Sequence, residues 1–259
     1  MKEKAKTKST ATQPPAPEVV SFPMRINKYL AWKKHSTRRG ADDLIKDKKV
    51  FLNGKLAVLG DKVNEKDTVE VRFRGPKPSY IYIAYNKPVG VVTHSAQEGE
   101  VDILEKIKKN LGNDISSRGV FPIGRIDKES HGLILLTNDG RITERLLSPK
   151  FFHEKEYLVK TKEPLRSSFK EKMERGVQID EEKTAPCKVT IVNDNTFKII
   201  LTEGKRHQIR RMCVALFQEV LDLKRIRIMN VELAKLPDGA HREIKGKELE
   251  VLLKSLELA

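Results

Sequence analysis

A single acid between two cations, in a loop bracketed by glycines, is the strongest chemical signal in this chain. The loop reads GRIDKESHG from Gly124 to Gly132, and Asp127 stands between Arg125 and Lys128. Nearby positive charge favours the ionised form of a carboxyl group, so Asp127 is expected to be charged at neutral pH and available as a nucleophile or a base. An aspartate that only caps a turn shows the same local pattern, so a structural role stays open.

The residues after the loop predict the element that positions it. Residues 133–136, LILL, form a short continuous apolar run, which is typical of a strand buried on both faces. Residues 138–140, NDG, end that strand with turn chemistry. Asp127 is therefore predicted at the mouth of a buried strand.

A second segment could bring an aromatic ring to the same place. Residues 155–159 alternate as a strand does, which puts Lys155, Tyr157 and Val159 on one face. Tyr157 is either a core residue or the aromatic platform that an unstacked base needs.

A third segment gathers cations at the start of a helix. Apolar residues at helical spacing predict this amphipathic helix, namely Ile209, Met212, Cys213 and Leu216. Its beginning carries four potential cations, Arg206, His207, Arg210 and Arg211. Cations there oppose the helix dipole, so an anion is expected nearby, either a phosphate or a carboxylate.

The whole chain is strongly basic. Its 259 residues carry a formal net charge of +15, which indicates a polyanionic partner. No apolar run is long enough to span a membrane, and no apolar stretch follows the basic N-terminus as in a signal peptide. Cys187 and Cys213 give neither a zinc-ligand spacing nor a disulfide framework, and there is no Gly-rich phosphate loop. We predict a cytoplasmic protein with both thiols buried and reduced, and with no metal or cofactor.

The chain divides into an arm and two domains. Residues 1–23 are basic and poor in large apolar side chains, which predicts a disordered arm without an assigned function. Residues 24–74 predict two helices, the second capped by Ser36 or Thr37, and a small sheet with a hairpin at Asn53-Gly54. Residues 75–79 form a Gly/Pro linker, and residues 80–259 form the second domain.

The small domain is a candidate nucleic-acid binder. Residues 25–74 hold fourteen Lys and Arg against seven acids. A helix start with two arginines can aim backbone N–H groups and guanidinium groups at phosphates, although a solvated charged face has the same composition.

The second domain mixes strands and helices, so the predicted fold class is α+β. Strands are expected near residues 80–85, 187–192, 196–201 and 224–231, and helices near 101–110, 141–147, 164–176 and 246–257.

The stretch GRIDKESHGLILLTNDG resembles the catalytic motif of the RsuA-type pseudouridine synthases. Residues 24–74 resemble the S-four-type RNA-binding domain that precedes the catalytic domain in this family, and NKPVG at residues 86–90 resembles the first catalytic-domain motif. The similarity runs from about residue 24 to 255 and is greatest to the RluF-like branch, which acts on large-subunit ribosomal RNA and in some cases on tRNA.

The resemblance implies a mixed, mainly antiparallel sheet and conversion of uridine to pseudouridine without cofactor or metal. It implies that Asp127 is the essential residue, that Tyr157 stacks on the target base and that Arg210 forms an ion pair with Asp127. The predicted substrate-binding residues are Arg125, Lys155, Ile228, Asn86 and Lys87. The predicted RNA-binding residues are Arg25, Lys28, Arg38, Arg39, Arg206, His207 and Arg211.

Three positions depart from the family pattern. Asp47-Lys48-Lys49 stands where a glycine usually precedes the first strand, Phe217 replaces a helix-ending glycine, and His241 replaces a tryptophan. All three affect turns or packing away from the acid. The alternatives to an enzyme are a non-catalytic RNA-binding or ribosome-assembly protein on the same scaffold and a general RNA chaperone. A monomer is expected, since no spare apolar helix face is evident.

Overall fold

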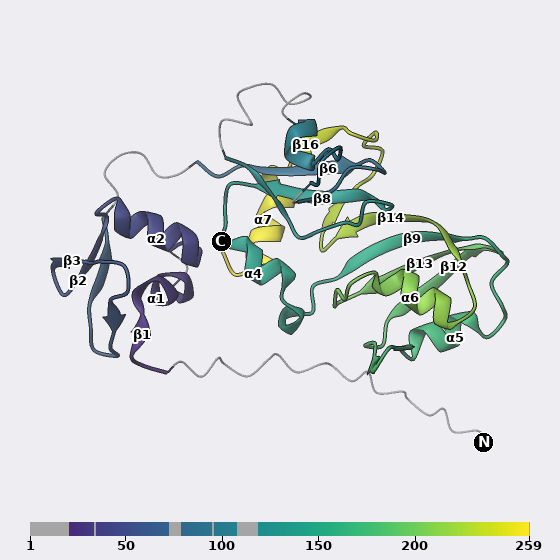
Figure 1. Ribbon diagram of the computed structural model, residues 1–259, viewed down its shortest axis with the longest axis horizontal. Coiled ribbons are helices and arrows are strands. Elements are labelled where there is room, and N and C mark those ends of the chain that lie inside the picture. Colours follow the sequence, from purple (N-terminus) through teal and green to yellow (C-terminus); the bar gives the residue numbers. More distant parts are fainter. Residues whose placement is uncertain (1–20, 34, 73–78, 95, 108–118, 259) are drawn as a thin grey trace, which may run out of the picture.

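The computed structural model describes residues 21–33, 35–72, 79–94, 96–107 and 119–258. Figure 1 shows two bodies, a small one at the left formed by residues 21–72 and a larger one built on a long twisted sheet. Residues 1–20 and 73–78, with most of the predicted arm and linker, lie outside the described residues. The domain boundaries stay a prediction.

The small body folds around its own core. Its strands are β1 (Met24–Arg25), β2 (Val50–Leu52), β3 (Lys55–Leu56), β4 (Lys62–Val63) and β5 (Val69–Val71), and its helices are α1 (Ile26–Trp32) and α2 (Arg38–Lys46). Both helices and the strands contribute buried side chains to one cluster, including Ile26, Leu30, Ile45 and Val50. Thr37 is the cap of α2, since its Oγ1 accepts a hydrogen bond from the Gly40 N–H at 3.0 Å.

Two of the unusual positions adopt the backbone that a glycine would favour. Lys48, in the segment before β2, has φ 57°, and Phe217, at the end of the helix that follows the cation cluster, has φ 60°. A left-handed conformation costs a non-glycine residue about 1–2 kcal/mol. The departures from the family pattern therefore leave the turn geometry in place and strain it locally.

The large body is built on a nine-stranded sheet. Its strands are β6 (Tyr82–Lys87), β7 (Phe121–Ile123), β8 (His131–Thr137), β9 (Lys155–Thr161), β12 (Lys188–Asn193), β13 (Thr196–Leu201), β14 (Val220–Ile228), β15 (Val231–Glu232) and β16 (His241–Glu243). The order is β12-β13-β9-β14-β8-β6-β16, with β15 on β14 and β7 on β8. Among the described strands only β8 and β14 pair in parallel, so the predicted mixed, mainly antiparallel sheet is confirmed.

Helices cover both faces of this sheet. They are α4 (Ile142–Leu147), the short 3-10 turn η1 (Pro149–Phe151), α5 (Phe169–Glu174), α6 (Gln208–Ala215) and α7 (Gly246–Ser255), and residues 103–107 are also helical. A separate hairpin consists of β10 (Gln178–Ile179) and β11 (Glu182–Lys183). Within β8, Leu133 and Leu135 pack with α4 and α7, whereas Ile134 and Leu136 pack with residues 103–107. The prediction of a strand buried on both faces is therefore confirmed.

A glycine allows the close approach of β8 and β14. Gly132 pairs with Arg225 and has φ +105°, and a Cβ added at Gly132 would lie 2.3 Å from the Arg225 carbonyl oxygen. A side chain at this position would overlap backbone atoms, which cannot rotate away. Gly132 thus fixes the end of β8 nearest Asp127, where the Gly124–Gly132 loop ends.

The two bodies are in contact. A Cβ added at Gly140, just before α4, would lie 2.4 Å from Cγ2 of Thr37 at the start of α2. Figure 1 shows α1 and α2 facing the end of the large body that carries α4. No helix in the described part of the chain is both long and apolar enough to cross a membrane.

Several elements differ from the sequence-based expectation. The helix expected at 164–176 is confined to α5, and β14 begins at Val220 rather than near 224. The short strands β7, β10, β11, β15 and β16 were not predicted. Cys213 is buried as expected but Cys187 is only partly so; both thiols are free, and burial raises the pKa of each to about 12.

Candidate active site

The loop that carries Asp127 connects β7 to β8 and is held by hydrogen bonds to Thr93 and within the loop itself. Thr93 clamps it, because its Oγ1 donates to the Ile126 carbonyl at 2.8 Å and accepts from the Ile126 N–H at 3.1 Å. The Ser130 N–H donates to the Asp127 carbonyl at 3.1 Å. The backbone on both sides of the acid is therefore fixed, while its side chain remains 34% exposed.

The turn after β6 supports the same loop. The Gly90 N–H donates to the Lys128 carbonyl at 2.8 Å. Beneath it, the fully buried Lys87 donates from Nζ to the carbonyls of Pro88 and Val91. Burial lowers the pKa of Lys87 to about 8, and the negative charge of Asp127 opposes that shift. Lys87 thus contributes positive charge below the acid.

His207 is the side-chain partner of Asp127. Its Nε2 lies 3.5 Å from Asp127 Oδ1, close enough for an ion pair when the imidazole is protonated. His207 precedes α6 and has a left-handed backbone with φ 49°. Such strain in a non-glycine residue persists only where the surroundings impose it, and here it aims the ring at the acid.

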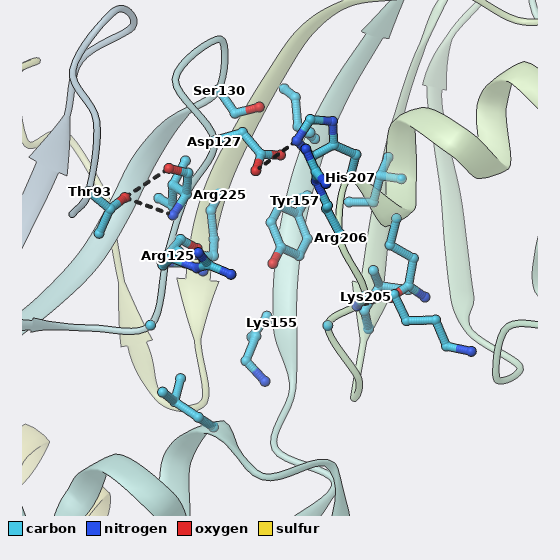
Figure 2. Close-up of a pocket in the computed structure, with 18 of the residues that line it drawn as sticks. Thr93, Arg125, Asp127, Ser130, Lys155, Tyr157, Lys205, Arg206, His207 and Arg225 are labelled. Atoms are coloured by element: carbon cyan, nitrogen blue, oxygen red, sulfur yellow. Dashed lines mark hydrogen bonds and ion pairs between the residues drawn. The ribbon is translucent and has the colours of Figure 1, made fainter. Parts of the chain in front are cut away.

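Asp127 opens into a large cavity of about 870 Å³. Figure 2 shows the Asp127 carboxylate, the Tyr157 ring and the His207 ring around one space, with Arg125, Lys155 and Arg206 nearby. These residues come from the Gly124–Gly132 loop, from β9 and from the segment before α6. The cavity is thus lined by two acids, Asp127 and Glu203, by the Tyr157 ring and by several cations.

The pairing of β9 with β14 sets the direction of Tyr157. Tyr157 pairs with Arg225, so the two side chains lie on the same face of the sheet. The register shifts between Arg225 and Arg227, which marks a bulge beside the site. Arg225 is 5% exposed and donates from Nε to the Leu133 carbonyl at 2.7 Å. It therefore ties β14 to β8 while it lines the cavity beside the tyrosine.

Arg210 has partners other than the one that the family resemblance implies. It donates to the Val220 carbonyl at 3.1 Å, to the Glu129 carbonyl at 3.1 Å and to Ser130 Oγ at 3.3 Å. Glu129 and Ser130 belong to the Gly124–Gly132 loop that carries Asp127. Arg210 thus holds α6, β14 and this loop together, whereas His207 makes the side-chain contact with Asp127.

Lys155 lines the cavity, and its pKa is lower than that of an ordinary lysine. Burial lowers the pKa of Lys155 to about 8, and the charge of Arg225 adds to the shift. Its Nζ donates to the His153 carbonyl at 3.1 Å. Such a lysine is charged at neutral pH and becomes neutral a little above it.

The remaining predicted site residues occupy varied places. Asn86 is buried and donates its amide to the Leu236 carbonyl and to Asp238 Oδ1, and Ile228 is 2% exposed within the core. Arg211 forms an ion pair with Asp180 of the β10–β11 turn. Asn86 and Ile228 are thus buried and do not line the cavity.

The cations predicted in the small body separate into groups. Lys28 and Arg38 line a second hollow, between the two bodies, and Arg25 is exposed on β1. The side chain of Arg39 lies outside the described part.

Sequence reasoning missed Arg225 and Thr93. An arginine within the apolar alternation of residues 220–228 was a usable signal, because a buried guanidinium needs specific partners. Thr93 had no signal, since only the folded chain brings it to Ile126, 33 positions away. Within the described residues, no group of three or more His, Cys, Asp or Glu is placed to hold a metal ion.

Two family models match this chain. Residues 24–69 match the S4 domain, and residues 81–215 match the RNA pseudouridylate synthase family. These ranges correspond to the small body and to much of the large one, including the Gly124–Gly132 loop.

Individual proteins agree with these matches. The chain is 41% identical over 238 residues to the dual-specificity RNA pseudouridine synthase RluF of Escherichia coli K12, covering 90% of this chain and 80% of the relative. It is 33% identical over 236 residues to the ribosomal large subunit pseudouridine synthase B of Bacillus subtilis 168, covering 88% and 95%. A crystal structure of a pseudouridylate synthase is 26% identical and matches with a TM-score of 0.64 over 90% of this chain and 99% of that chain. The chain therefore belongs to the RsuA-type family of RNA pseudouridine synthases, near RluF.

Proposed function

We propose that this protein isomerises a specific uridine in large-subunit ribosomal RNA to pseudouridine, with Asp127 as the catalytic residue. The observation that carries the proposal is the convergence of Asp127, His207 and the Tyr157 ring on one cavity beside buried positive charge. A scaffold that only binds RNA needs the basic surface but has no need of an acid held by backbone bonds on both sides. This favours the enzyme over the non-catalytic alternative.

The reaction assigns a role to each group. The target base leaves the stack and lies against Tyr157, at an unstacking cost of a few kcal/mol. Asp127 acts at the sugar, either by adding to C1′ or by removing a proton from C2′. The C1′–N1 bond breaks, the uracil turns, C5 bonds to C1′, and the C5 proton leaves to solvent. Lys87 supplies positive charge beside Asp127, and His207 forms an ion pair with Asp127 when its imidazole is protonated.

The choice of RNA follows from the relatives. RluF is named for dual specificity, and the Bacillus subtilis relative for the large ribosomal subunit. We therefore place the substrate in large-subunit ribosomal RNA, with tRNA as a second substrate class. We further propose that the protein acts as a monomer in the cytoplasm, where its S4 domain and its net charge of +15 bind this RNA.

Pseudouridine mapping of total RNA tests this function. Cells that lack the protein are expected to lose pseudouridine at one or a few sites, and the wild-type chain is expected to restore them. An unchanged map in the deleted strain would contradict the enzymatic proposal. Loss of pseudouridine in tRNA alone, with ribosomal RNA unchanged, would contradict the proposal that large-subunit ribosomal RNA is the substrate.

A pH dependence is expected from Lys155. Its pKa of about 8 leaves it charged below that pH and neutral above it, and RNA phosphates favour the charged form. RNA affinity is therefore highest below pH 8 and falls roughly tenfold as the pH rises through that value, because one charge-assisted contact is lost. Fluorescence anisotropy with labelled substrate RNA measures this change.

Lys155→Arg is the matched control, since arginine keeps its charge throughout this range. The variant is expected to bind with a flatter pH profile. A profile unchanged from wild type would assign the titration to another group, such as Lys87, whose pKa is also about 8.

A further inference from the structure

A second hollow lies between the two bodies of the protein. Its volume is about 370 Å³, and residues of α1, α2, α4 and η1 contribute to its walls. The residues that bear on its chemistry are Lys28, Trp32, Arg38, Arg145, Lys150 and Phe151. We call this hollow the interdomain cleft.

The cleft is strongly positive. Lys28 and Arg38 approach from the small body, and Arg145 and Lys150 from the large one. Arg145 is ion-paired with Glu257 and only 19% exposed, whereas Lys150 is 42% exposed beside Glu144 at 3.4 Å. Cations that converge from two elements of the fold, with part of their charge accessible, fit a phosphate backbone.

The cleft also presents two aromatic rings. Trp32 is 38% exposed, with Lys33 Nζ 4.5 Å from its ring centroid. Phe151, on η1, lines the same cleft, with Lys150 Nζ 5.0 Å from its ring centroid and the His153 ring stacked on it at 5.9 Å. Aromatic rings among cations are the groups on which proteins stack unpaired bases of single-stranded nucleic acid.

The cleft lies next to the active-site cavity. Thr143 of α4 lines both the cleft and the cavity, so α4 lies between the two. An RNA strand whose target base enters the cavity at Asp127 can therefore continue over α4 into the cleft. The volume of about 370 Å³ suits one or two nucleotide units rather than a duplex.

We propose that the interdomain cleft binds a single-stranded stretch of the RNA that flanks the target nucleotide. Phosphates contact Lys150, Lys28 and Arg38, and one base stacks between the sides formed by Phe151 and Trp32. This inference rests on the proposed function for the identity of the strand. It adds a positioning role for η1 and gives the contact between the two bodies a part in RNA binding.

Trp32 offers a direct test, because it is the only tryptophan in the chain. A short oligouridylate titrated into the full-length protein is expected to quench the tryptophan emission in a saturable way, since a nucleobase stacked near the indole quenches it. Phe151→Ala is expected to weaken this binding by about 5- to 150-fold, the range for the loss of one stacking ring. Lys150→Glu is expected to weaken it and to make its salt dependence shallower by about 0.7 in log–log slope.

Lys170→Glu is the matched control. It makes the same charge change on an exposed residue of α5, which Figure 1 places at the end of the large body away from the small one. It is expected to bind within about twofold of wild type, because distant exposed charges are screened. The proposal for the cleft would be overturned if Lys150→Glu and Lys170→Glu weakened binding equally. It would also be overturned if oligouridylate did not change the tryptophan emission. Stronger quenching by an RNA duplex than by oligouridylate would overturn the assignment to a single strand.

This test is separate from that of the reaction. Quenching is read without catalysis, so Asp127→Asn is expected to show it in full. If oligouridylate quenches normally but cells that lack the protein keep the same pseudouridine map, only the proposed function is contradicted. If the map changes but oligouridylate does not quench, only the proposal for the cleft is contradicted.

Discussion

Asp127→Asn is expected to abolish pseudouridine formation, with a loss of roughly 10²–10⁴-fold or more in rate. Asparagine keeps the shape of the side chain but can neither attack the sugar nor accept its proton. The loop should stay in place, because Thr93, Ser130 and Gly90 hold it through backbone atoms. Tritium release from RNA labelled at uracil C5 measures the reaction, since that hydrogen leaves in every turnover.

Glu171→Gln is the control for this change. It makes the same carboxylate-to-amide replacement on α5, where Glu171 is exposed and paired with Arg175. The control is expected to release tritium at the wild-type rate. If Asp127→Asn retained more than a small fraction of that rate while binding RNA normally, the catalytic role would have to move to another residue of the cavity.

Gly132→Ala is expected to destabilise the large body by roughly 2–6 kcal/mol. The backbone at φ +105° strains an alanine by about 1–3 kcal/mol. The overlap of the new Cβ with the Arg225 backbone, 2.3 Å from its carbonyl oxygen, adds a similar cost because β8 and β14 must separate. Calorimetry should show the melting temperature of this body lowered by roughly 5–20 °C.

Gly54→Ala separates the two costs. Gly54 also has a positive φ, +79°, but no atom lies within 4 Å of its added Cβ. Its substitution should therefore show only the backbone strain, about 1–3 kcal/mol, in the small body. Similar losses at the two glycines would mean that the sheet yields easily at Gly132, and that the close approach of β8 and β14 contributes little to stability.

The fold could be predicted where the pattern along the chain is local. The apolar run after the Asp127 loop predicted β8, the alternation after Lys155 predicted β9, and the apolar spacing from Ile209 predicted α6. The place of β14 between β8 and β9 could not be predicted. Its register joins Arg225 to Gly132, 93 positions earlier, and only tertiary packing selects that pairing.

The site, too, has residues that the local sequence predicts and a contact that it does not. Asp127 and Tyr157 stand in extended motifs, and the structure brings both to one cavity. The partner of the acid was assigned to Arg210 by family resemblance, whereas the structure places His207 there and Arg210 against the loop backbone. Which of two cations one helical turn apart reaches a carboxylate depends on the left-handed backbone at His207, and no spacing rule predicts that conformation.

The insertion of β14 between β9 and β8 has a consequence for synthesis on the ribosome. The small body has its own core and can form as soon as the first seventy or so residues emerge. The strand β8, which follows Asp127, pairs with β14 only after about a hundred further residues have been made. Until β14 has been added, His131 and Gly132 of β8 lack their partner strand, and β9 exposes an unpaired edge from Lys155 to Thr161. A prematurely ended chain therefore has its RNA-binding module and its acid but no finished cavity, and its open strand edge directs it toward aggregation before it can modify RNA.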